Sequence, residues 1–400
     1  MPGYSFLHTA DLHFGAGFTG RLELSPEKKE QLSQKIKQGF INLIKTAEEQ
    51  NVSAVLICGD LFDKETINYD TINFFYRKLG ESRIPFFLLP GNHDSYSQDS
   101  YYNPDWLIRR GINWPQNLKI FTSPQWECLA LNPDVNIYGY RFTEQNASSR
   151  VLEEKCSPQE GKINLALFHG SCLDFVSPDK TTSSRLIFPF SQKELYQQSF
   201  TYLALGHYHN FREFRNEKGI LKAAYPGSPW GWNLNETGEK VTLLLELDET
   251  AKIKSRISLV DYRIWDEALE LTGLGDSAEL EEQIQALLQK LEVKPEDIFH
   301  LRLTGRINNH LELNELEKIE GKLNRDLFHF QLDFSGLTPD YPIEVLLNSH
   351  IPTLENQFAK KLCKMESQAP PKEKWLYTQA LYYGLDALNQ QIKEIKPRWS

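Results

Sequence analysis

The sequence contains little cysteine and no long apolar run. Its five cysteines are dispersed among 400 residues and form no Cys-x-x-Cys pair. This usage argues against a disulfide framework and a cysteine-based zinc site, and we expect reduced thiols in a cytoplasm. No stretch approaches the roughly 18 apolar residues that a membrane-spanning helix needs, so no membrane association is expected. Residues 1–8 lack a basic segment leading into an apolar one, so no signal peptide is expected.

Basic residues are also in the minority. Lys and Arg total 44 against 54 Asp and Glu, a net charge of −10. A protein that holds nucleic acid mainly by neutralising phosphates normally has a basic surface. If this chain handles a polyanion, bound cations or a partner must therefore supply positive charge. The length predicts two or three globular domains.

The first part of the chain alternates short apolar runs with amphipathic stretches. Strands are predicted at Tyr4–Thr9, Val52–Cys58, Ile84–Leu89, Asn164–Phe168 and Thr201–Leu205, and helices at Glu27–Gln50 and Thr66–Leu79. Strands separated by helices predict an α/β layered domain with helices outside a sheet. Later strand-like runs at Val241–Leu247 and Ile253–Val260 have hairpin-like connections, so a mixed sheet or two packed sheets is expected.

The pattern changes after Val260. A β-α-β-α-β order is predicted from Ile264–Leu271, Ser277–Leu291, Ile298–Thr304, Leu311–Leu323 and Phe328–Phe334. Glu344–Lys396 then carries two helical patterns that Gln368–Pro371 separates. We therefore expect three domains: residues 1–260, an α+β domain at 261–340 and a helical tail at 341–400.

Each strong early strand ends in polar residues of the same kind. They are Asp11 and His13; Asp60 and Asp63; Asn92, His93 and Asp94; His169; and His207 and His209. Taken singly, such an Asp can cap a helix, such an Asn can form a turn, and such a His can lie hydrogen-bonded in the core. In α/β folds, however, the carboxyl ends of strands meet at one edge, where ligands bind. Half of the ten histidines fall at these strand ends, which favours a shared site.

Carboxylates and imidazoles gathered in one crevice need positive charge, because buried like charges repel. Oxygen and nitrogen ligands without cysteine favour Mn, Fe or Zn, and histidine argues against Mg or Ca alone. In Asp11-x-His13 and His207-x-His209, a spacing of two places both side chains on one face of an extended chain. The sequence therefore predicts a pair of divalent cations at this edge.

In chain order, these motifs resemble the full set of the calcineurin-like metallophosphoesterases. The motifs are Asp11-x-His13, Gly59-Asp60-x-x-Asp63, Gly91-Asn92-His93-Asp94, His169 and Gly206-His207-x-His209. Within that family, Gly59–Phe62 and Tyr225–Pro229 resemble the SbcD-type DNA repair exonucleases, in particular the bacterial YhaO-type proteins. The resemblance implies an α/β fold, a four-layer αββα sandwich with a small α+β cap domain and a helical C-terminal tail.

The resemblance also implies a role for each site residue. One metal ion would be held by Asp11, His13 and His209, the other by Asn92, His169 and His207, with Asp60 bridging both. Mn²⁺ is the expected ion, with Fe²⁺ and Zn²⁺ as alternatives. His93 would act as general acid, with Asp94 setting its tautomer. Asp63 stands where some nucleases of the group carry histidine, and we expect it to orient His93 or a metal ligand.

The implied activity is a two-metal DNA phosphodiesterase in repair, a 3′→5′ exonuclease with single-strand endonuclease activity as a further expectation. Two alternatives stay open. The same site could hydrolyse a small phosphodiester or phosphomonoester, which the acidic balance favours and the residues after Val260 disfavour. A non-catalytic scaffold is opposed by the intact ligand set. Trp230 and Trp232 could stack on unpaired bases or pack in the core.

The tail is basic in an acidic chain. Leu346–Ser400 holds eight Lys and Arg against five Asp and Glu. Its apolar positions, Trp375, Leu376, Leu381, Leu385, Leu388 and Ile392, follow helical spacing. The resemblance implies that these helices dock on an SMC-like ATPase of the YhaN type, while packing against the protein itself is an equal alternative. The sequence leaves open whether the chain forms a homodimer.

Overall fold

The structure is a computed structural model that describes residues 3–18, 22–154, 156–175, 186–272, 274, 276–307 and 313–389. It divides into two compact units, Met1–Ile264 and Trp265–Ser400, which are described separately. The predicted tail from residue 341 shares the second unit with the sheet that precedes it, so the division into three domains remains a prediction. The predicted helix start at Leu311 and the tail residues 390–396 lie outside the described residues.

In the described part of the chain, the first unit is built on a twelve-stranded mixed sheet. Its order is β4-β3-β2-β1-β11-β12-β10-β8-β7-β6-β5, and β9 pairs with β10 off this path. The strands are β1 (Tyr4–Thr9), β2 (Ala54–Cys58), β3 (Phe86–Leu89), β4 (Leu118–Ile120), β5 (Glu127–Asn132), β6 (Val135–Gly139), β7 (Ile163–His169), β8 (Tyr202–Gly206), β9 (Arg212–Arg215), β10 (Leu221–Tyr225), β11 (Thr242–Leu247) and β12 (Ala251–Ile257).

The sheet consists of two parallel parts joined by an antiparallel hairpin. Strands β1 to β4 are parallel to one another, as are β6, β7, β8 and β10, and β11–β12 links the two sets. The sheet curls so that β2 packs against β7 and β8. Apolar side chains from both parts, among them Leu56, Phe87, Leu165 and Leu243, fill the space between them. This confirms the predicted mixed α/β sandwich.

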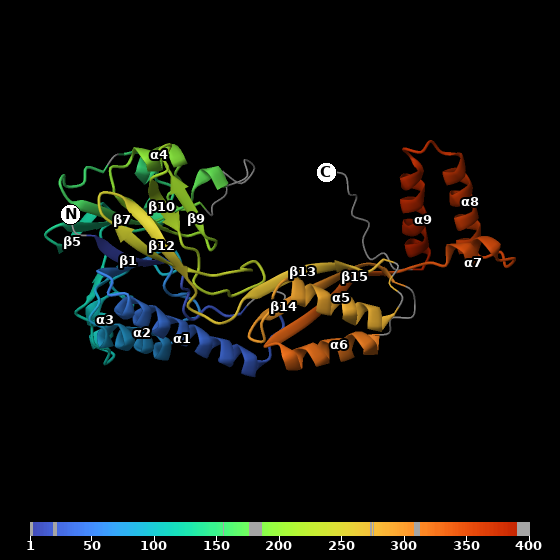
Figure 1. The fold of residues 1–400 in the computed structure, drawn as a ribbon, viewed down its shortest axis with the longest axis horizontal. Helices are drawn as coiled ribbons and strands as arrows, with labels where there is room; N and C mark the ends of the chain where they lie inside the picture. Colours follow the sequence, from blue (N-terminus) through green and yellow to red (C-terminus); the bar gives the residue numbers. More distant parts are fainter. Residues whose placement is uncertain are drawn as a thin grey trace. The chain divides into compact units, whose positions relative to one another are not determined.

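Helices cover the outside of the curled sheet (Figure 1). The long helix α1 (Pro26–Glu49) begins at Ser25, whose side chain accepts the Lys28 amide hydrogen, and buries an apolar stripe that includes Phe40. Helix α2 (Tyr69–Glu81) lies beside it, followed by the short α3 (Pro104–Ile108), while α4 (Gln192–Gln197) contacts β10. Short 3₁₀ turns occur at Glu144–Asn146, Val151–Glu153 and Leu173–Phe175.

The two tryptophans near the predicted site belong to the core. Trp230 is fully buried, and its indole Nε1 donates a hydrogen bond to the Leu12 carbonyl at 2.8 Å. Trp232 is also buried and packs against Phe18. The base-stacking alternative is therefore wrong for both residues.

The second unit contains a three-stranded sheet of order β13-β14-β15 in its described residues. Its strands are β13 (Ile264–Glu270), β14 (Ile298–Ile307) and β15 (His329–Pro339), with β14 and β15 parallel. Helices α5 (Ser277–Lys290) and α6 (Leu313–Asp326) pack with the sheet around a core that includes Leu280, Phe299 and Phe330.

The tail folds into three helices, α7 (Ile343–Asn348), α8 (Leu354–Gln368) and α9 (Lys374–Leu388). Leu381 and Leu385 of α9 are buried against Ala359 of α8, so part of the predicted apolar stripe packs within the protein. Ile392 lies outside the described residues. No described helix is long and apolar enough to cross a membrane.

One buried carboxylate ties the tail to the sheet. Asp386 accepts hydrogen bonds from Arg306 at 3.1 and 2.8 Å and from the Tyr341 hydroxyl at 2.8 Å. Burial opposes ionisation, but these donors hold the pKa of Asp386 below its usual range. The ionised carboxylate therefore stabilises the fold at neutral pH, and this stabilisation is lost as the pH falls through the pKa of the folded state.

We expect Asp386→Ala to lower the free energy of unfolding by about 1–3 kcal/mol, because it removes the hydrogen bonds that a buried carboxylate accepts from the Arg306 guanidinium and the Tyr341 hydroxyl. Urea unfolding of the full chain measures this loss. Glu282→Ala, at an exposed position on α5 of the same unit, is the control, with an expected change within about 0.5 kcal/mol. Equal effects of the two substitutions would refute a stabilising contribution of the Asp386 hydrogen bonds.

Candidate metal centre

The loops that follow β1, β2, β3, β7 and β8 meet at one edge of the curled sheet. Tight approaches between these loops require glycine at three positions. A Cβ at Gly206 would lie 1.7 Å from the Cys58 carbonyl oxygen, and one at Gly59 would lie 2.0 Å from His169 Nδ1. A Cβ at Gly91 would lie 2.1 Å from Asp60 Oδ1. The glycines before Asp60, Asn92 and His207 therefore let these strand ends come together.

Several site residues have left-handed backbone conformations. Asp11, His13 and Asp60 have φ of 53°, 45° and 45°, and His207 has 112°. The expectation that Asp11-x-His13 and His207-x-His209 are extended is therefore wrong. Such conformations cost about 1–3 kcal/mol each and persist only where the surroundings enforce them. Here the Asp11 amide donates to the Gly59 carbonyl at 3.1 Å, and the His13 amide donates to the backbone carbonyl of Asp60 at 2.9 Å.

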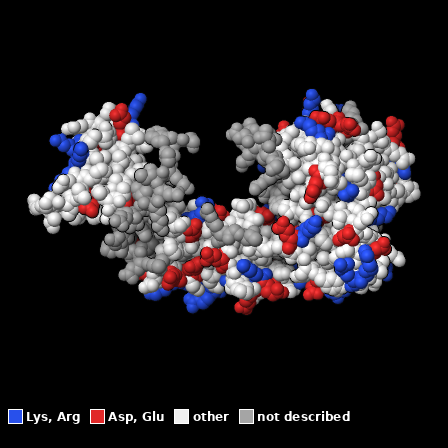
Figure 2. Space-filling model, turned by 180° about the vertical axis from the view of Figure 1, so that it is seen from behind, with Lys and Arg blue, Asp and Glu red and all other residues white. Residues whose placement is uncertain are grey.

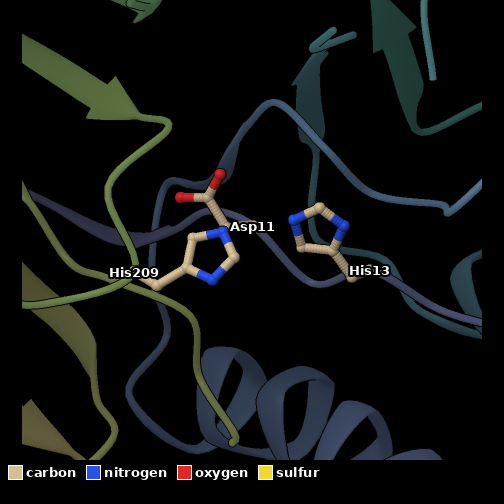
Figure 3. Close-up of side chains that lie close together, drawn as sticks. All are labelled: Asp11, His13 and His209. Atoms are coloured by element: carbon tan, nitrogen blue, oxygen red, sulfur yellow. The ribbon is translucent and has the colours of Figure 1, made fainter. Parts of the chain in front are cut away.

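A first cluster consists of Asp11, His13 and His209, whose potential ligand atoms lie within 4.8 Å of one another. Figure 3 shows the Asp11 carboxylate next to the His209 ring, with His13 beside them. The His207 amide donates to both carboxylate oxygens of Asp11 at 3.0 Å. Among the described residues, the buried His13 Nε2 has no hydrogen-bond partner.

A second cluster forms around His169. Its Nδ1 lies 3.1 Å from the Cys58 carbonyl oxygen, which can only accept, so this nitrogen carries a hydrogen. Its Nε2 lies 3.1 Å from Asn92 Oδ1 and 3.3 Å from Asp60 Oδ2. The ring of His207 packs edge-on at a centroid distance of 5.3 Å. Nε2 thus faces one oxygen atom of Asn92 and one of Asp60.

Asp60 lies between the two clusters. Its Oδ2 is 3.3 Å from His169 Nε2 and 3.7 Å from His13 Nε2. Its Oδ1 accepts the His93 amide hydrogen at 2.9 Å, which fixes the carboxylate. A single oxygen atom of Asp60 therefore approaches a nitrogen from each cluster.

Burial and crowding shift the pKa values of these groups in opposite directions. Burial lowers the pKa of His13 to about 4 and, together with the neighbouring His169, lowers that of His207 to about 3. Burial also raises the pKa of Asp11. Burial opposes ionisation of Asp60, but His169, His13 and His93 hold its pKa well below its usual range. Burial likewise opposes protonation of His169, but the Asp60 carboxylate raises the pKa of this histidine to about 9.

This donor set fits a pair of divalent cations. Asp11 and Asp60 are buried carboxylates that need nearby positive charge, and the buried His13 Nε2 makes no hydrogen bond to the described residues. Neutral imidazoles such as His13 and His207 are the form that ligates metals. Oxygen and nitrogen donors without a thiolate suit Mn, Fe or Zn.

His93 and Asp63 lie at the exposed side of the first cluster. A carboxylate oxygen of Asp63 and ring nitrogens of His93 and His13 lie within 4.8 Å of one another. The His93 side chain is exposed, and its ring packs edge-on against His13 at 4.9 Å. Asp63 is therefore a carboxylate that lies near the His93 ring.

Asp94 has a different environment from the one expected. Its carboxylate accepts the amide hydrogens of Gly91 at 2.7 Å, Leu61 at 2.6 Å and Phe62 at 3.0 Å, and the Tyr102 hydroxyl hydrogen. With its oxygens occupied by these donors, Asp94 joins the loop after β3 to the loop after β2. The expectation that it sets the His93 tautomer is replaced by this loop-fixing arrangement.

Sequence reasoning missed Glu236. Its carboxylate Oε1 lies 2.6 Å from His209 Nδ1. Glu236 follows His209 by 27 residues in a loop before β11, without a strand end or histidine beside it. No local pattern distinguishes it from the acidic residues that are common in exposed loops.

Comparison with known proteins agrees with this geometry. The family model for calcineurin-like phosphoesterases matches residues 4–211, more than half of the chain and all five strand ends. The chain belongs to the calcineurin-like phosphoesterase family. The "Uncharacterized metallophosphoesterase YhaO" of Bacillus subtilis (strain 168) is 22% identical over 302 residues, which cover 74% of this chain and 70% of that protein. As a calcineurin-like phosphoesterase, the protein is a metal-dependent hydrolase of phosphoesters.

We expect Asp94→Asn to destabilise this calcineurin-like phosphoesterase by about 2–4 kcal/mol, because the amide replaces one accepting oxygen with a donor that faces other donors. Chemical unfolding of the metal-free protein measures the effect. Asp99→Asn is the matched control, at an exposed position five residues further along the same loop. If both variants unfold at the same denaturant concentration, Asp94 does not fix the loops.

Proposed function

We propose that the protein is a cytoplasmic two-metal DNA phosphodiesterase, a 3′→5′ exonuclease of DNA repair. The observation that carries the proposal is the position of Asp60 Oδ2, which lies 3.7 Å from His13 Nε2 of the first cluster and 3.3 Å from His169 Nε2 of the second. Asp11, His13 and His209 would hold one ion, Asn92, His169 and His207 the other, and Asp60 both. Mn²⁺ is the proposed ion, with Fe²⁺ and Zn²⁺ as alternatives. When bound, such ions polarise the phosphoryl oxygens and lower the pKa of water, which supplies the nucleophile.

The protein's own groups would position the substrate and move protons. His93 is exposed beside the clusters, where it can donate a proton to the leaving oxygen. Asp63, in reach of His93, would hold the ring in the donating orientation. Asn92 contributes a neutral amide oxygen, so it adds no negative charge opposite the anionic phosphate.

The choice of DNA rests on two sequence segments and on the second unit. Gly59–Phe62 and Tyr225–Pro229 resemble the SbcD-type exonucleases, and a hydrolase of small esters needs no additional unit of this size. On the face shown in Figure 2, acidic and basic side chains are interspersed over the described residues. Because the whole chain has a net charge of −10, positive charge for a DNA phosphate would come chiefly from the metal centre. The net charge of −10 keeps a small phosphoester as the second candidate.

An assay on three substrates tests the proposal. Purified protein with Mn²⁺ is given linear duplex DNA labelled at either end, single-stranded DNA, or bis-p-nitrophenyl phosphate. We expect release of nucleotides from 3′ ends and slower turnover of the small ester. Turnover of the small ester alone would establish the second candidate, and release from 5′ ends would refute the polarity.

We expect Asp60→Asn to abolish hydrolysis, because it removes the carboxylate shared by both clusters. His93→Ala should lower kcat by about 10²-fold or more while the bound metal content stays the same, as loss of a general acid does. Asp99→Asn is the control and should retain wild-type activity. Folded Asp60→Asn or His93→Ala protein that degrades DNA at the wild-type rate would refute the assigned roles.

We also propose that the tail helices dock on an SMC-like ATPase. Eight of the eleven exposed large apolar side chains among the described residues lie between Val345 and Leu388. Trp375 is 61% and Leu376 44% exposed at the start of α9. Large exposed apolar patches commonly mark protein interaction sites. Leu381 and Leu385 face the core of the unit, whereas Trp375 and Leu376 of the same helix are exposed and can contact a partner.

Trp375→Ser combined with Leu376→Ser should weaken binding to the co-expressed ATPase by about tenfold or more, as loss of an interface aromatic does. Affinity co-purification and titration measure binding, and nuclease activity should be unchanged. Tyr69→Ser, which removes an exposed aromatic from the first unit, is the control. Undiminished ATPase binding would refute docking at this surface, and a smaller particle size in light scattering would show instead that the surface joins two copies of the chain.

A further inference from the structure

We propose that Glu236 is a positioning residue that fixes the His209 ring for metal binding. The proposal rests on the proposed function in one respect, that a cation occupies the cluster of Asp11, His13 and His209. Glu236 Oε1 lies 2.6 Å from His209 Nδ1, and the His13 ring lies next to the same ring at a centroid distance of 5.0 Å. Glu236 lies outside the matched residues 4–211, and it is not one of the strand-end residues.

The hydrogen bond determines which nitrogen of His209 is free to bind a cation. An ionised carboxylate can only accept hydrogen bonds, so Nδ1 must carry the hydrogen. The lone pair of a neutral ring is then on Nε2. Because Glu236 occupies Nδ1, Nε2 is the atom that His209 can offer to the cluster. The ring lies next to the Asp11 carboxylate (Figure 3). A carboxylate in this position also raises the basicity of a histidine ligand.

Glu236 is itself held in place from several directions. The residue is 5% exposed, and its Oε2 accepts the Trp232 amide hydrogen at 2.9 Å. Asn233 donates to Oε1 at 3.4 Å. The loop is anchored on both sides of Glu236, because the Tyr262 hydroxyl donates to the Gly231 carbonyl at 3.1 Å and the Gly238 amide donates to Ile264 at 3.0 Å. The carboxylate is therefore restrained before any ion binds.

Lys240 restrains the backbone of the same histidine. Its Nζ donates to the His209 carbonyl at 3.1 Å and lies 3.4 Å from Asn210 Oδ1. The loop that carries Glu236 and Lys240 thus holds both the ring and the main chain of His209. Such a double restraint is expected of a residue whose orientation matters for ligand binding.

The two clusters differ in how their histidines are oriented. His169 Nδ1 is bound by the neutral carbonyl of Cys58, whereas His209 Nδ1 is bound by a charged carboxylate. Removing the charge of Glu236 should therefore weaken the ion at the first cluster and leave the ion at the second cluster unaffected. If Glu236 only stabilised the loop, its substitution would lower the free energy of unfolding and leave the affinity for both ions unchanged.

Calorimetric titration of the metal-free full chain with Mn²⁺ tests the proposal. In Glu236→Gln, the amide keeps the size of the side chain and loses its charge. We expect one of the two binding steps to weaken by about 10- to 100-fold, as loss of such a partner does, and the other to stay unchanged. Glu239→Gln is the control, because it removes the same charge from an exposed position in the same loop and should bind as wild type.

A double-mutant cycle shows whether Glu236 acts through His209. In a His209→Asn background, Glu236→Gln should cause no further loss of Mn²⁺ affinity. The thermal unfolding midpoint of each metal-free variant is measured in parallel. Mn²⁺ affinity unchanged in Glu236→Gln, or lowered equally in both backgrounds, would overturn the positioning role. A wild-type chain that binds no Mn²⁺ would overturn the proposed function together with this inference, so the two failures are distinguishable.

Discussion

The structure depends on one electrostatic constraint, the burial of the Asp11 and Asp60 carboxylates at a single edge of the sheet. Buried anions this close together are unfavourable unless positive charge lies between or beside them. The imidazoles of His13, His169 and His209 surround them, and Asp60 approaches two of these rings through one oxygen atom. A pair of cations would satisfy the same groups more fully, which is why the site is best understood as a metal centre of a phosphoesterase.

The rest of the first unit serves to hold these groups together. Two sets of parallel strands direct their carboxyl ends to the same edge, and the hydrophobic core between them fixes the distance. Glycines remove the side chains that would keep the loops apart, and left-handed residues at Asp11, His13 and Asp60 aim the ligands. The buried Asp94 joins two of the loops through its hydrogen bonds. Local strain of this kind is common at functional sites, because the surrounding structure enforces it.

The sequence predicts the edge of the sheet well and the arrangement around it poorly. Polar residues after apolar runs locate the site because parallel strands share one carboxyl edge, a rule of topology that needs no atomic detail. The hydrogen bonds of Asp94 could not be predicted, since the amides of Leu61 and Phe62 that it accepts from are 33 and 32 residues away and meet it only in the folded chain. Glu236 and the pair Arg306–Asp386 are contacts between distant segments, and only folding brings them together. The short strand β4 (Leu118–Ile120) has too few residues to show a pattern.

The most direct measurement of the central claim is the anomalous scattering of crystals grown with Mn²⁺. Our account predicts two peaks per chain, one among Asp11, His13 and His209 and the other among Asn92, His169 and His207, with Asp60 contacting both. Peaks elsewhere on the protein, or none at this edge in crystals that contain bound Mn²⁺ in other places, would contradict it.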